Sequence, residues 1–281
     1  MRAETSPIPF ALAGAGVRLA GDRWGDGRPP VLLLHGGGQT RHSWDRTAER
    51  LAAGGRTAVT YDARGHGQSG WAPDGDYRLD RFVDDLRAVA AVVDAPPVLV
   101  GASLGGMTSL VAVGERRVAA RGLVLVDIAV RAEPAGIERI HRFLAAAPDG
   151  FATLEEAADA VAAYNPHRPR PASPEGLRKN LRRGEDGRWR WHWDPAFLGL
   201  SDEARRREPP ARLAAAARAL EVPVLLVRGG SSDVLSDEGV AHFRGLLPSV
   251  EVVDVRGTGH MLVGDDNDVF ADALDGFVDR I

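Results

Sequence analysis

The sequence predicts an α/β protein, in which buried parallel strands alternate with amphipathic helices. Short continuous apolar runs are typical of strands buried on both faces. Such runs recur at residues 31–34, 57–61, 99–100, 122–126, 222–228 and 250–255. Several of them end at glycine-rich turns, and segments with helical periodicity lie between them. This alternation predicts a doubly wound sheet with helices on both faces.

Helices are expected wherever apolar residues recur at a spacing of three or four. The clearest case is residues 80–93, where Phe82, Leu86 and Val89 fall on one face, opposite acidic residues and arginines. The same periodicity predicts helices at residues 43–52, 104–114, 237–247 and 267–280. We find no internal repeat and no long low-complexity linker.

Residues 131–210 interrupt the alternation of strands and helices. Two helices are expected at residues 137–147 and 154–164, and the second begins with Thr153 as its N-cap. A proline-rich stretch follows, and then a third helix near residues 175–182. This interval is therefore expected to form a helical insertion outside the sheet.

The segment Gly101-Ala102-Ser103-Leu104-Gly105 is the most informative motif of the chain. The pattern Gly-x-Ser-x-Gly between a strand and a helix is that of a nucleophile elbow. The serine there lies in a strained turn, so its neighbours must lack side chains for the strand and the helix to approach closely. The motif makes Ser103 the candidate nucleophile.

Two further loops complete a family pattern. His35-Gly36-Gly37-Gly38 follows one buried run, and residues 62–69 (Asp-Ala-Arg-Gly-His-Gly-Gln-Ser) follow the next. With the elbow, in this order, they resemble the α/β-hydrolase superfamily over essentially the whole chain. The resemblance implies an eight-stranded, mostly parallel sheet flanked by helices, with a helical cap inserted between strands 6 and 7. We expect the core at residues 1–130 and 211–281, and the cap at 131–210.

The partners of Ser103 follow from the chain order Ser, then Asp or Glu, then His, that the superfamily uses. Asp233 and His260 each follow a late buried strand, where ligands bind in parallel sheets. An imidazole accepts the serine proton, and a buried carboxylate orients that imidazole.

Each assignment has a competitor. His242 lies inside an expected helix, which favours His260. Asp237 and Glu238 resemble the first acids of that helix, where they suit its dipole. Asp127 ends an earlier strand and is the stronger rival to Asp233, because some relatives carry their acid there.

Backbone amides must stabilise the oxyanion that forms on the substrate. By resemblance, these donors are the amides of Leu104 and Gly37. Substrate contacts are expected from Gly38 and from the three tryptophans of the segment Trp189-Arg190-Trp191-His192-Trp193. An extended segment would place Trp189, Trp191 and Trp193 on one face. The alternative interpretation is that these indoles only anchor the cap to the core.

The composition is that of an ordinary enzyme. In 281 residues, 44% are hydrophobic and the formal net charge is −4, which favours neither nucleic acid nor another polyanion as partner. The absence of cysteine excludes disulfides, thiolate metal sites and a cysteine nucleophile. No apolar run reaches the length of a membrane span, and the N-terminal residues are a poor match to a signal peptide. We expect a cytoplasmic protein without metal or organic cofactor, and the sequence leaves its oligomeric state open.

The expected function is a serine hydrolase that cleaves a small carboxylic ester or lactone through an acyl-enzyme. Serine at position 103 argues against epoxide hydrolases and haloalkane dehalogenases, which carry aspartate there. Hydrolysis of a C–C bond and perhydrolase (cofactor-free haloperoxidase) chemistry use the same triad and are alternatives. A non-catalytic binding protein with the same fold is an alternative of another class.

Overall fold

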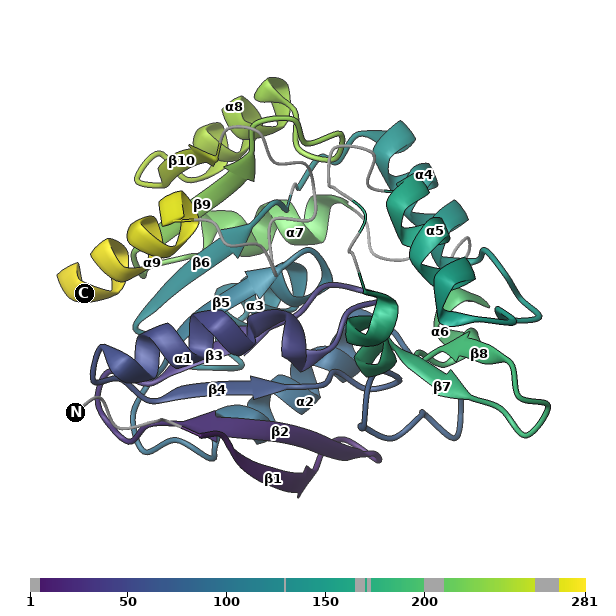
Figure 1. Cartoon of the computed structure of the whole chain (residues 1–281). Coiled ribbons are helices and arrows are strands. Elements are labelled where there is room, and N and C mark those ends of the chain that lie inside the picture. The colour runs from purple at the N-terminus through teal and green to yellow at the C-terminus, as the bar shows by residue number, and fades with distance from the viewer. Residues whose placement is uncertain (1–5, 129, 165–169, 171–172, 200–209, 256–267) are drawn as a thin grey trace.

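A computed structural model describes residues 6–128, 130–164, 170, 173–199, 210–255 and 268–281. Its main sheet has eight strands in the order β1-β2-β4-β3-β5-β6-β9-β10 (Figure 1). The strands are β1 (Ile8–Ala13), β2 (Arg18–Trp24), β3 (Val31–Leu34), β4 (Ala58–Tyr61), β5 (Val98–Ala102), β6 (Gly122–Val126), β9 (Val224–Gly229) and β10 (Glu251–Val255).

The sheet is mostly parallel. Strand β2 pairs antiparallel with both β1 and β4, and every other pairing in this sheet of the described chain is parallel. The central strands are buried along their whole length, as their continuous apolar sequences predict. Parallel strands bring their carboxyl ends to one edge, so the loops after β3, β4, β5, β6 and β9 meet there. The eight-stranded, mostly parallel sheet is thus confirmed.

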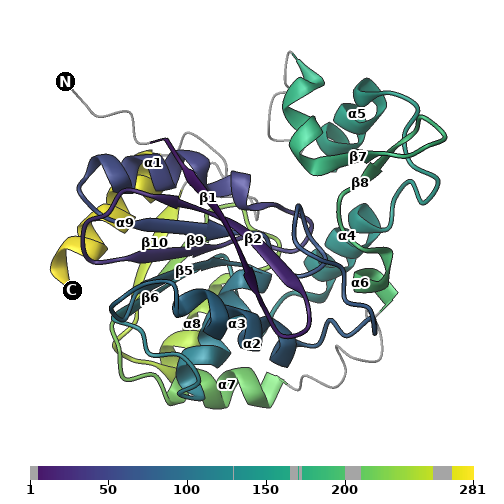
Figure 2. The same cartoon turned by 90° about the horizontal axis from the view of Figure 1, so that it is seen from below.

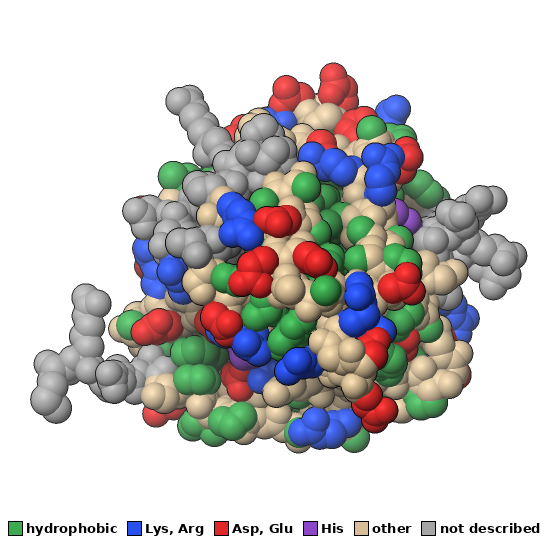
Figure 3. Space-filling model, turned by 45° about the vertical axis from the view of Figure 1, so that its right-hand side comes forward, with side chains coloured by type: hydrophobic (Ala, Val, Ile, Leu, Met, Phe, Trp, Pro, Cys, Tyr) green, Lys and Arg blue, Asp and Glu red, His purple; other side chains and the backbone are tan. Residues whose placement is uncertain are grey.

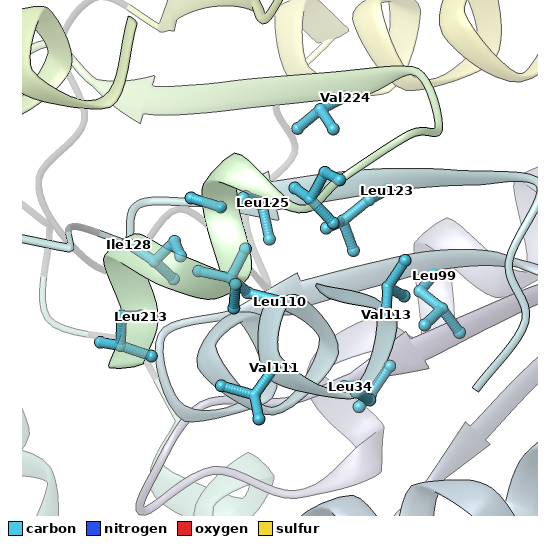
Figure 4. Packing of buried hydrophobic residues seen from close by; sticks show 14 of the residues in the cluster. Leu34, Leu99, Leu110, Val111, Val113, Leu123, Leu125, Ile128, Leu213 and Val224 are labelled. Atoms are coloured by element: carbon cyan, nitrogen blue, oxygen red, sulfur yellow. The ribbon is translucent and has the colours of Figure 1, made fainter. Parts of the chain in front are cut away.

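Helices cover both faces of the sheet (Figure 2). One face packs against α1 (Asp45–Ala53) and α9 (Asp268–Arg280). The other packs against α2 (Leu79–Ala90), α3 (Leu104–Gly114), α7 (Pro210–Arg218) and α8 (Asp237–Leu246). Helix α3 is buried along most of its length. Its apolar side chains lie among those of β3, β5, β6 and α7 (Figure 4).

Between β6 and α7 the chain leaves the sheet and forms a separate group of elements beside it (Figures 1 and 2). These elements, which we call the cap, are α4 (Pro134–Leu144), α5 (Leu154–Tyr164), the 3-10 helix η2 (Pro174–Asn180), β7 (Leu181–Arg183), β8 (Trp189–Trp191) and α6 (Pro195–Gly199). Strands β7 and β8 form an antiparallel hairpin. The cap has its own apolar cluster around Phe151, Leu154, Ala157 and Leu181.

The helix expected at residues 175–182 is wrong in its last two residues, which belong to a strand. Residues Pro174–Asn180 form a 3-10 helix, and the chain then enters β7. Leu181 is buried and pairs with Trp191 of β8. Pairing across the hairpin therefore overrides the local helical pattern, as tertiary contacts often do.

Other boundaries differ from the expectations by a few residues, as for α4, which begins at Pro134 rather than 137. Proline is favoured in the first turn of a helix, because its missing N–H would be unpaired there anyway. The division of the chain at residues 131 and 210 stays a prediction. Among the described residues, no helix is long and apolar enough to cross a membrane.

Candidate active site

Ser103 lies in the turn between β5 and α3 with a strained backbone. Its φ of 46° and ψ of −112° fall where few residues other than glycine are found. The Ser103 amide donates to the Val126 carbonyl on β6 (3.2 Å), and its carbonyl accepts from Met107 in α3 (2.9 Å). These bonds stabilise the turn, which presents the side chain at the carboxyl edge of the sheet. Such strain in a well-supported turn is typical of functional sites.

Glycines around Ser103 are required by close backbone contact. A Cβ on Gly101 would lie 2.4 Å from the Gly105 carbonyl oxygen, and one on Gly105 would lie 2.5 Å from the Leu34 carbonyl oxygen. A Cβ on Gly106 would lie 2.5 Å from the Ile128 side chain. Helix α3 can therefore start directly above the ends of β3 and β5 only because these positions lack side chains.

Two backbone amides near Ser103 are not engaged by other described residues. The Leu104 amide is the first of α3, where amides lack a partner within the helix. In the loop after β3, the Gly36 amide donates to Gln39 Oε1 (2.9 Å) and the Gly38 amide donates to His66 Nε2 (3.1 Å). This leaves the Gly37 amide without a hydrogen bond within the described chain. Leu104 and Gly37 thus offer two backbone donors near Ser103.

The loop that carries Gly37 lies close to the serine. A Cβ on Gly36 would be 3.3 Å from Ser103 Cβ. On its other side, a Cβ on Gly38 would lie 2.4 Å from Leu144 Cδ2 and 3.3 Å from the Trp193 ring. The glycine loop is therefore packed between the elbow and the cap. We call residues 35–40 the oxyanion loop.

Asp127 follows β6, the strand next to the one that carries Ser103. Its side chain is buried, and its φ is 47°. One carboxylate oxygen accepts from the Gly229 amide (3.1 Å), and the other accepts from Ser232 Oγ (2.6 Å). The loop after β9 therefore fixes this carboxylate at the carboxyl edge of the sheet.

Asp233 lies in a different setting. Its side chain is 34% exposed, and its Oδ2 lies 3.0 Å from Nε of Arg139 on α4. The loop that carries it packs closely against the start of α4, since a Cβ on Gly136 would lie 2.2 Å from the Asp233 carbonyl oxygen. In the described structure, Asp233 connects the core to the cap through an ion pair.

His260, the expected catalytic base, lies outside the described residues. Strand β10 ends at Val255, and the Gly230 amide donates to its carbonyl (2.8 Å). The carboxyl ends of β9 and β10 therefore lie side by side. The competitor His242 is exposed on α8, and Asp237 and Glu238 occupy the first turn of that helix after the N-cap Ser236.

The three tryptophans of the cap lie in different environments. Trp189 and Trp191 pack in the apolar cluster of the cap, and Trp189 also lies beneath the guanidinium groups of Arg178 and Arg183. Trp191 stacks on Trp193 with ring centroids 5.0 Å apart. Trp193 is 4% exposed and is the one of the three that contacts the oxyanion loop.

Sequence reasoning missed the buried charges that hold the loop at residues 62–69. Arg41 donates to Asp62 and Asp22 (2.5 Å each), and all three side chains are buried. Arg64 forms a bidentate pair with Asp85 of α2 (2.7 and 2.9 Å). The signal was available in part, because Asp62 and Arg64 lie in the quoted family motif, but their partners are distant in sequence.

His35 and His66 accept hydrogen bonds in the core. His35 Nε2 accepts from the Ala63 amide (2.9 Å), and His66 Nε2 accepts from Gly38. Burial lowers the pKa of His35, and burial together with the neighbouring His35 lowers the pKa of His66 to about 3. Both rings are therefore neutral near pH 7 and order the loops through hydrogen bonds.

A cavity of about 510 Å³ lies at the opposite edge of the sheet. Its lining includes Pro30 and Arg121, which directly precede β3 and β6, and Pro96, which lies two residues before β5. It is thus far from the carboxyl ends of the strands, where the elbow lies. Within the described chain, no group of three or more His, Asp or Glu side chains could hold a metal ion.

Comparison with known proteins agrees with this architecture. The family model described as alpha/beta hydrolase fold matches residues 29–266. The chain belongs to the α/β-hydrolase family. Esterase Rv0045c of Mycobacterium tuberculosis is similar to this α/β hydrolase, with 31% identity over 97% of the chain and 90% of the relative. A 3-hydroxybutyrate-oligomer hydrolase of Cupriavidus necator is 30% identical, over 86% of the chain and 87% of the relative.

Solved structures show the same similarity. The crystal structure of E-2-(acetamidomethylene)succinate hydrolase superposes on this α/β hydrolase with a TM-score of 0.86 at 25% identity, covering 98% of the chain and 100% of that structure. A structure of the Mycobacterium tuberculosis esterase Rv0045c superposes with a TM-score of 0.77 at 29% identity, covering 97% of this chain and 92% of that structure. The protein is therefore a hydrolase of this family, and the expected fold class is confirmed.

Proposed function

We propose that the protein hydrolyses small carboxylic esters through an acyl-enzyme formed on Ser103. One observation carries the proposal: the strained Ser103 turn stands beside two backbone amides, of Leu104 and Gly37, that no described residue engages. This is the arrangement that a tetrahedral oxyanion requires. Relatives named as esterases and hydrolases add support.

The proposed reaction has two halves. Ser103 Oγ attacks the ester carbonyl while His260 takes its proton, and the oxyanion binds the Leu104 and Gly37 amides. His260 then gives the proton to the leaving alcohol, which departs and leaves the acyl group on Ser103. A water molecule activated by His260 attacks the acyl-enzyme, releases the acid and restores the serine.

For the triad acid, we propose Asp127 in place of the Asp233 favoured by the sequence. The triad needs a buried carboxylate close to the nucleophile, held so that it can orient an imidazole. Asp127 is buried, follows the strand next to that of Ser103 and is fixed by Gly229 and Ser232. Asp233 is one-third exposed and pairs with Arg139. The ion pair with the cap supports a structural role for Asp233.

The face that carries the cap favours small substrates over a polyanion. Acidic and basic side chains are interspersed on this face (Figure 3), so its visible part lacks the single-signed field typical of nucleic-acid binding. The substrate contacts proposed for Gly38 and Trp193 rest on their place beside the oxyanion loop. The cytoplasmic location stays a prediction from the N-terminal sequence.

A fluorophosphonate probe and a panel of esters test the proposal. The probe should label the wild-type protein on Ser103, and Ser103→Ala should prevent both labelling and turnover without changing the melting temperature by more than a few degrees. The panel should contain p-nitrophenyl esters of rising acyl length, lactones and ring-fission dienones, and we expect the short esters to be turned over fastest. Wild-type rates for Ser103→Ala would disprove the mechanism. A wild type that is not labelled would favour a non-catalytic binding protein.

A further inference from the structure

The backbone of the oxyanion loop has unusually large conformational freedom. Three consecutive glycines, Gly36 to Gly38, have the largest backbone freedom of any residue type. Within the loop, Gln39 accepts a hydrogen bond from the Gly36 amide, and on the core side His66 accepts one from the Gly38 amide. A catalytic donor must be fixed before the reaction, because its value depends on preorganisation. The position of the Gly37 amide therefore depends on the other contacts that the loop makes.

Those contacts come from the cap. Leu144 and Trp193 pack against Gly38, and the Phe197 ring would lie 3.3 Å from a Cβ on Gly37. Thr40 Oγ1 donates to Asn180 Oδ1 (3.2 Å), at the start of the β7–β8 hairpin. The cap therefore contacts the oxyanion loop on the side opposite Ser103.

The same hairpin holds the second core loop, at residues 62–69. The Asp194 amide donates to the Gly65 carbonyl (2.8 Å), and its carboxylate accepts from Tyr77 Oη (2.5 Å). The Arg182 guanidinium donates to the Gly67 carbonyl. The hairpin thus bridges two core loops that are themselves joined through His66.

His192 occupies the centre of this bridge. It follows β8 and is 2% exposed, and its Nδ1 accepts from the Gly67 amide (2.8 Å). Its ring centroid lies 5.7 Å from that of His66. Its buried Nε2 has no well-aligned hydrogen-bond partner in the described chain, although the Gly38 backbone lies near enough to raise its pKa.

The His192 ring is neutral, which fixes its hydrogen-bonding roles. Burial, followed by the neighbouring His66 and His35, holds the pKa of His192 well below its usual range. Because Nδ1 accepts a hydrogen bond, the single ring proton lies on Nε2, the nitrogen left to face the Gly38 backbone. One imidazole of the cap thus faces a backbone amide of one core loop and the backbone of the other.

We propose that His192 is a positioning residue for the oxyanion hole: by linking Gly67 to the Gly38 segment, it holds the Gly37 amide where the oxyanion forms. The inference rests on the proposed function and extends it, because it makes the cap part of the catalytic machinery. The simpler role, anchoring the cap alone, would affect stability and substrate binding but not the chemical step.

The matched pair His192→Asn and His192→Gln separates these roles. The Asn carbonyl lies where Nδ1 was and can accept from Gly67, whereas the longer Gln places its amide at the Nε2 position. On a p-nitrophenyl ester, we expect His192→Asn, which loses the group beside Gly38, to lower kcat about 10- to 100-fold with KM nearly unchanged. His192→Gln, which keeps a donor at the Nε2 position, should recover most of the rate. Arg190→Ala, on the same hairpin but paired with Asp186 at the exposed surface, should match the wild type.

Two further readouts complete the test. Inhibition by a phenylboronic acid, which forms a tetrahedral adduct on serine, should weaken by the same factor as kcat in His192→Asn. In wild-type protein with 15N-labelled histidine, the spectrum of His192 should show the Nε2–H tautomer and should shift when the boronic acid binds. This measurement needs no variant and holds even if one of the two fails to fold.

Several results would overturn the inference. These are an unchanged kcat in His192→Asn, equal losses in both variants, an effect on KM alone, or an Nδ1–H tautomer in the wild type. Loss of the proposed function itself looks different: the wild type would then fail to react with the fluorophosphonate probe or the boronic acid. The two failures are therefore distinguishable.

Discussion

Glycine at position 101 is required by contact between backbones. A Cβ there would meet the Gly105 carbonyl oxygen at 2.4 Å, and neither backbone can move without displacing Ser103. In packing this close, even one added methyl group destabilises the folded protein. The elbow motif therefore records a steric constraint as well as a catalytic one.

We predict that Gly101→Ala lowers the free energy of unfolding by about 1–3 kcal/mol, the usual cost of overpacking. Gly245→Ala is the matched control, because a Cβ on this exposed glycine of α8 meets nothing within 4 Å. Replacing glycine inside a helix should stabilise the protein by roughly 0.5–1 kcal/mol. Urea denaturation followed by circular dichroism measures both. Equal effects of the two substitutions would show that the elbow tolerates a side chain.

The two candidate acids differ in what their carboxylates bind. Asp127→Asn keeps the shape of the side chain but offers the imidazole the wrong hydrogen-bond partner, which costs about 10⁴-fold in kcat in another serine-hydrolase scaffold. We expect a loss of that order here. Asp233→Asn should cost less than about tenfold, since it weakens an ion pair that is partly exposed. Steady-state rates at several pH values distinguish them, and a larger loss for Asp233→Asn would return the role to that residue.

At the scale of elements, one row of three buried imidazoles joins the core loops to the cap. The ring centroids of His35 and His66 lie 5.3 Å apart, and those of His66 and His192 lie 5.7 Å apart. Each ring accepts a hydrogen bond from a backbone amide: His35 from Ala63, His66 from Gly38 and His192 from Gly67. A protonated ring could not accept these bonds at the same nitrogen. Protonation at acidic pH should therefore break these three hydrogen bonds before it disrupts the sheet.

The pH dependence of stability follows from the lowered pKa values. The pKa of His66 is about 3 in the folded protein and about 6.5 when unfolded, so the unfolded state binds the proton first as the pH falls. Stability is complete above pH 6.5 and declines below it, by about 2 kcal/mol between pH 7 and pH 5 for this one histidine. His66→Gln keeps an acceptor near the Nε2 position but cannot titrate. Urea titrations at pH 7, 6 and 5 should show a shallower decline for this variant, and parallel curves would contradict the assignment.

The Arg64–Asp85 pair connects the loop after β4 to helix α2. Both side chains are almost fully buried, and Arg64 also donates to the Ala15 carbonyl (3.0 Å). Removing one partner of a buried pair leaves an uncompensated charge, so Arg64→Met should destabilise the protein by about 3–5 kcal/mol. The double variant Arg64→Met, Asp85→Leu should recover much of that loss. Chemical denaturation tests this, and simple addition of the two single effects would show that the pair is not coupled.

At the scale of the whole molecule, the sequence predicted what local patterns can encode. Continuous apolar runs indicated the central strands, and the glycines around Ser103 indicated a turn that excludes side chains. The partners of the loop residues were not predictable in this way. Arg41, which follows β3, meets Asp22 of β2 because β4 pairs with both strands. His192 meets Gly67 from 125 residues away in the chain. Such contacts are set by topology rather than by periodicity.

Contacts between elements of the cap were likewise not predictable from local sequence patterns. The pattern of residues 175–182 is compatible with a helix in isolation, but Leu181 and Trp191 gain more by pairing across a hairpin. The choice between Asp127 and Asp233 depended on Arg139, whose position on α4 relative to the loop after β9 no motif specifies. Propensity predicted the elements, whereas the contacts between elements had to be observed.

The β7–β8 hairpin contacts two core loops, and this contact limits how freely caps can be exchanged between relatives. A cap is commonly regarded as a replaceable module that sets substrate choice on a constant core. Here Asn180, Arg182 and Asp194 bind core backbone and side chains directly. A transplanted cap without matching groups at these places would leave the glycine loop unsupported. Chimeras of this protein should therefore retain the hairpin together with Leu144, which also contacts Gly38, and vary the parts of the cap that face away from the core loops.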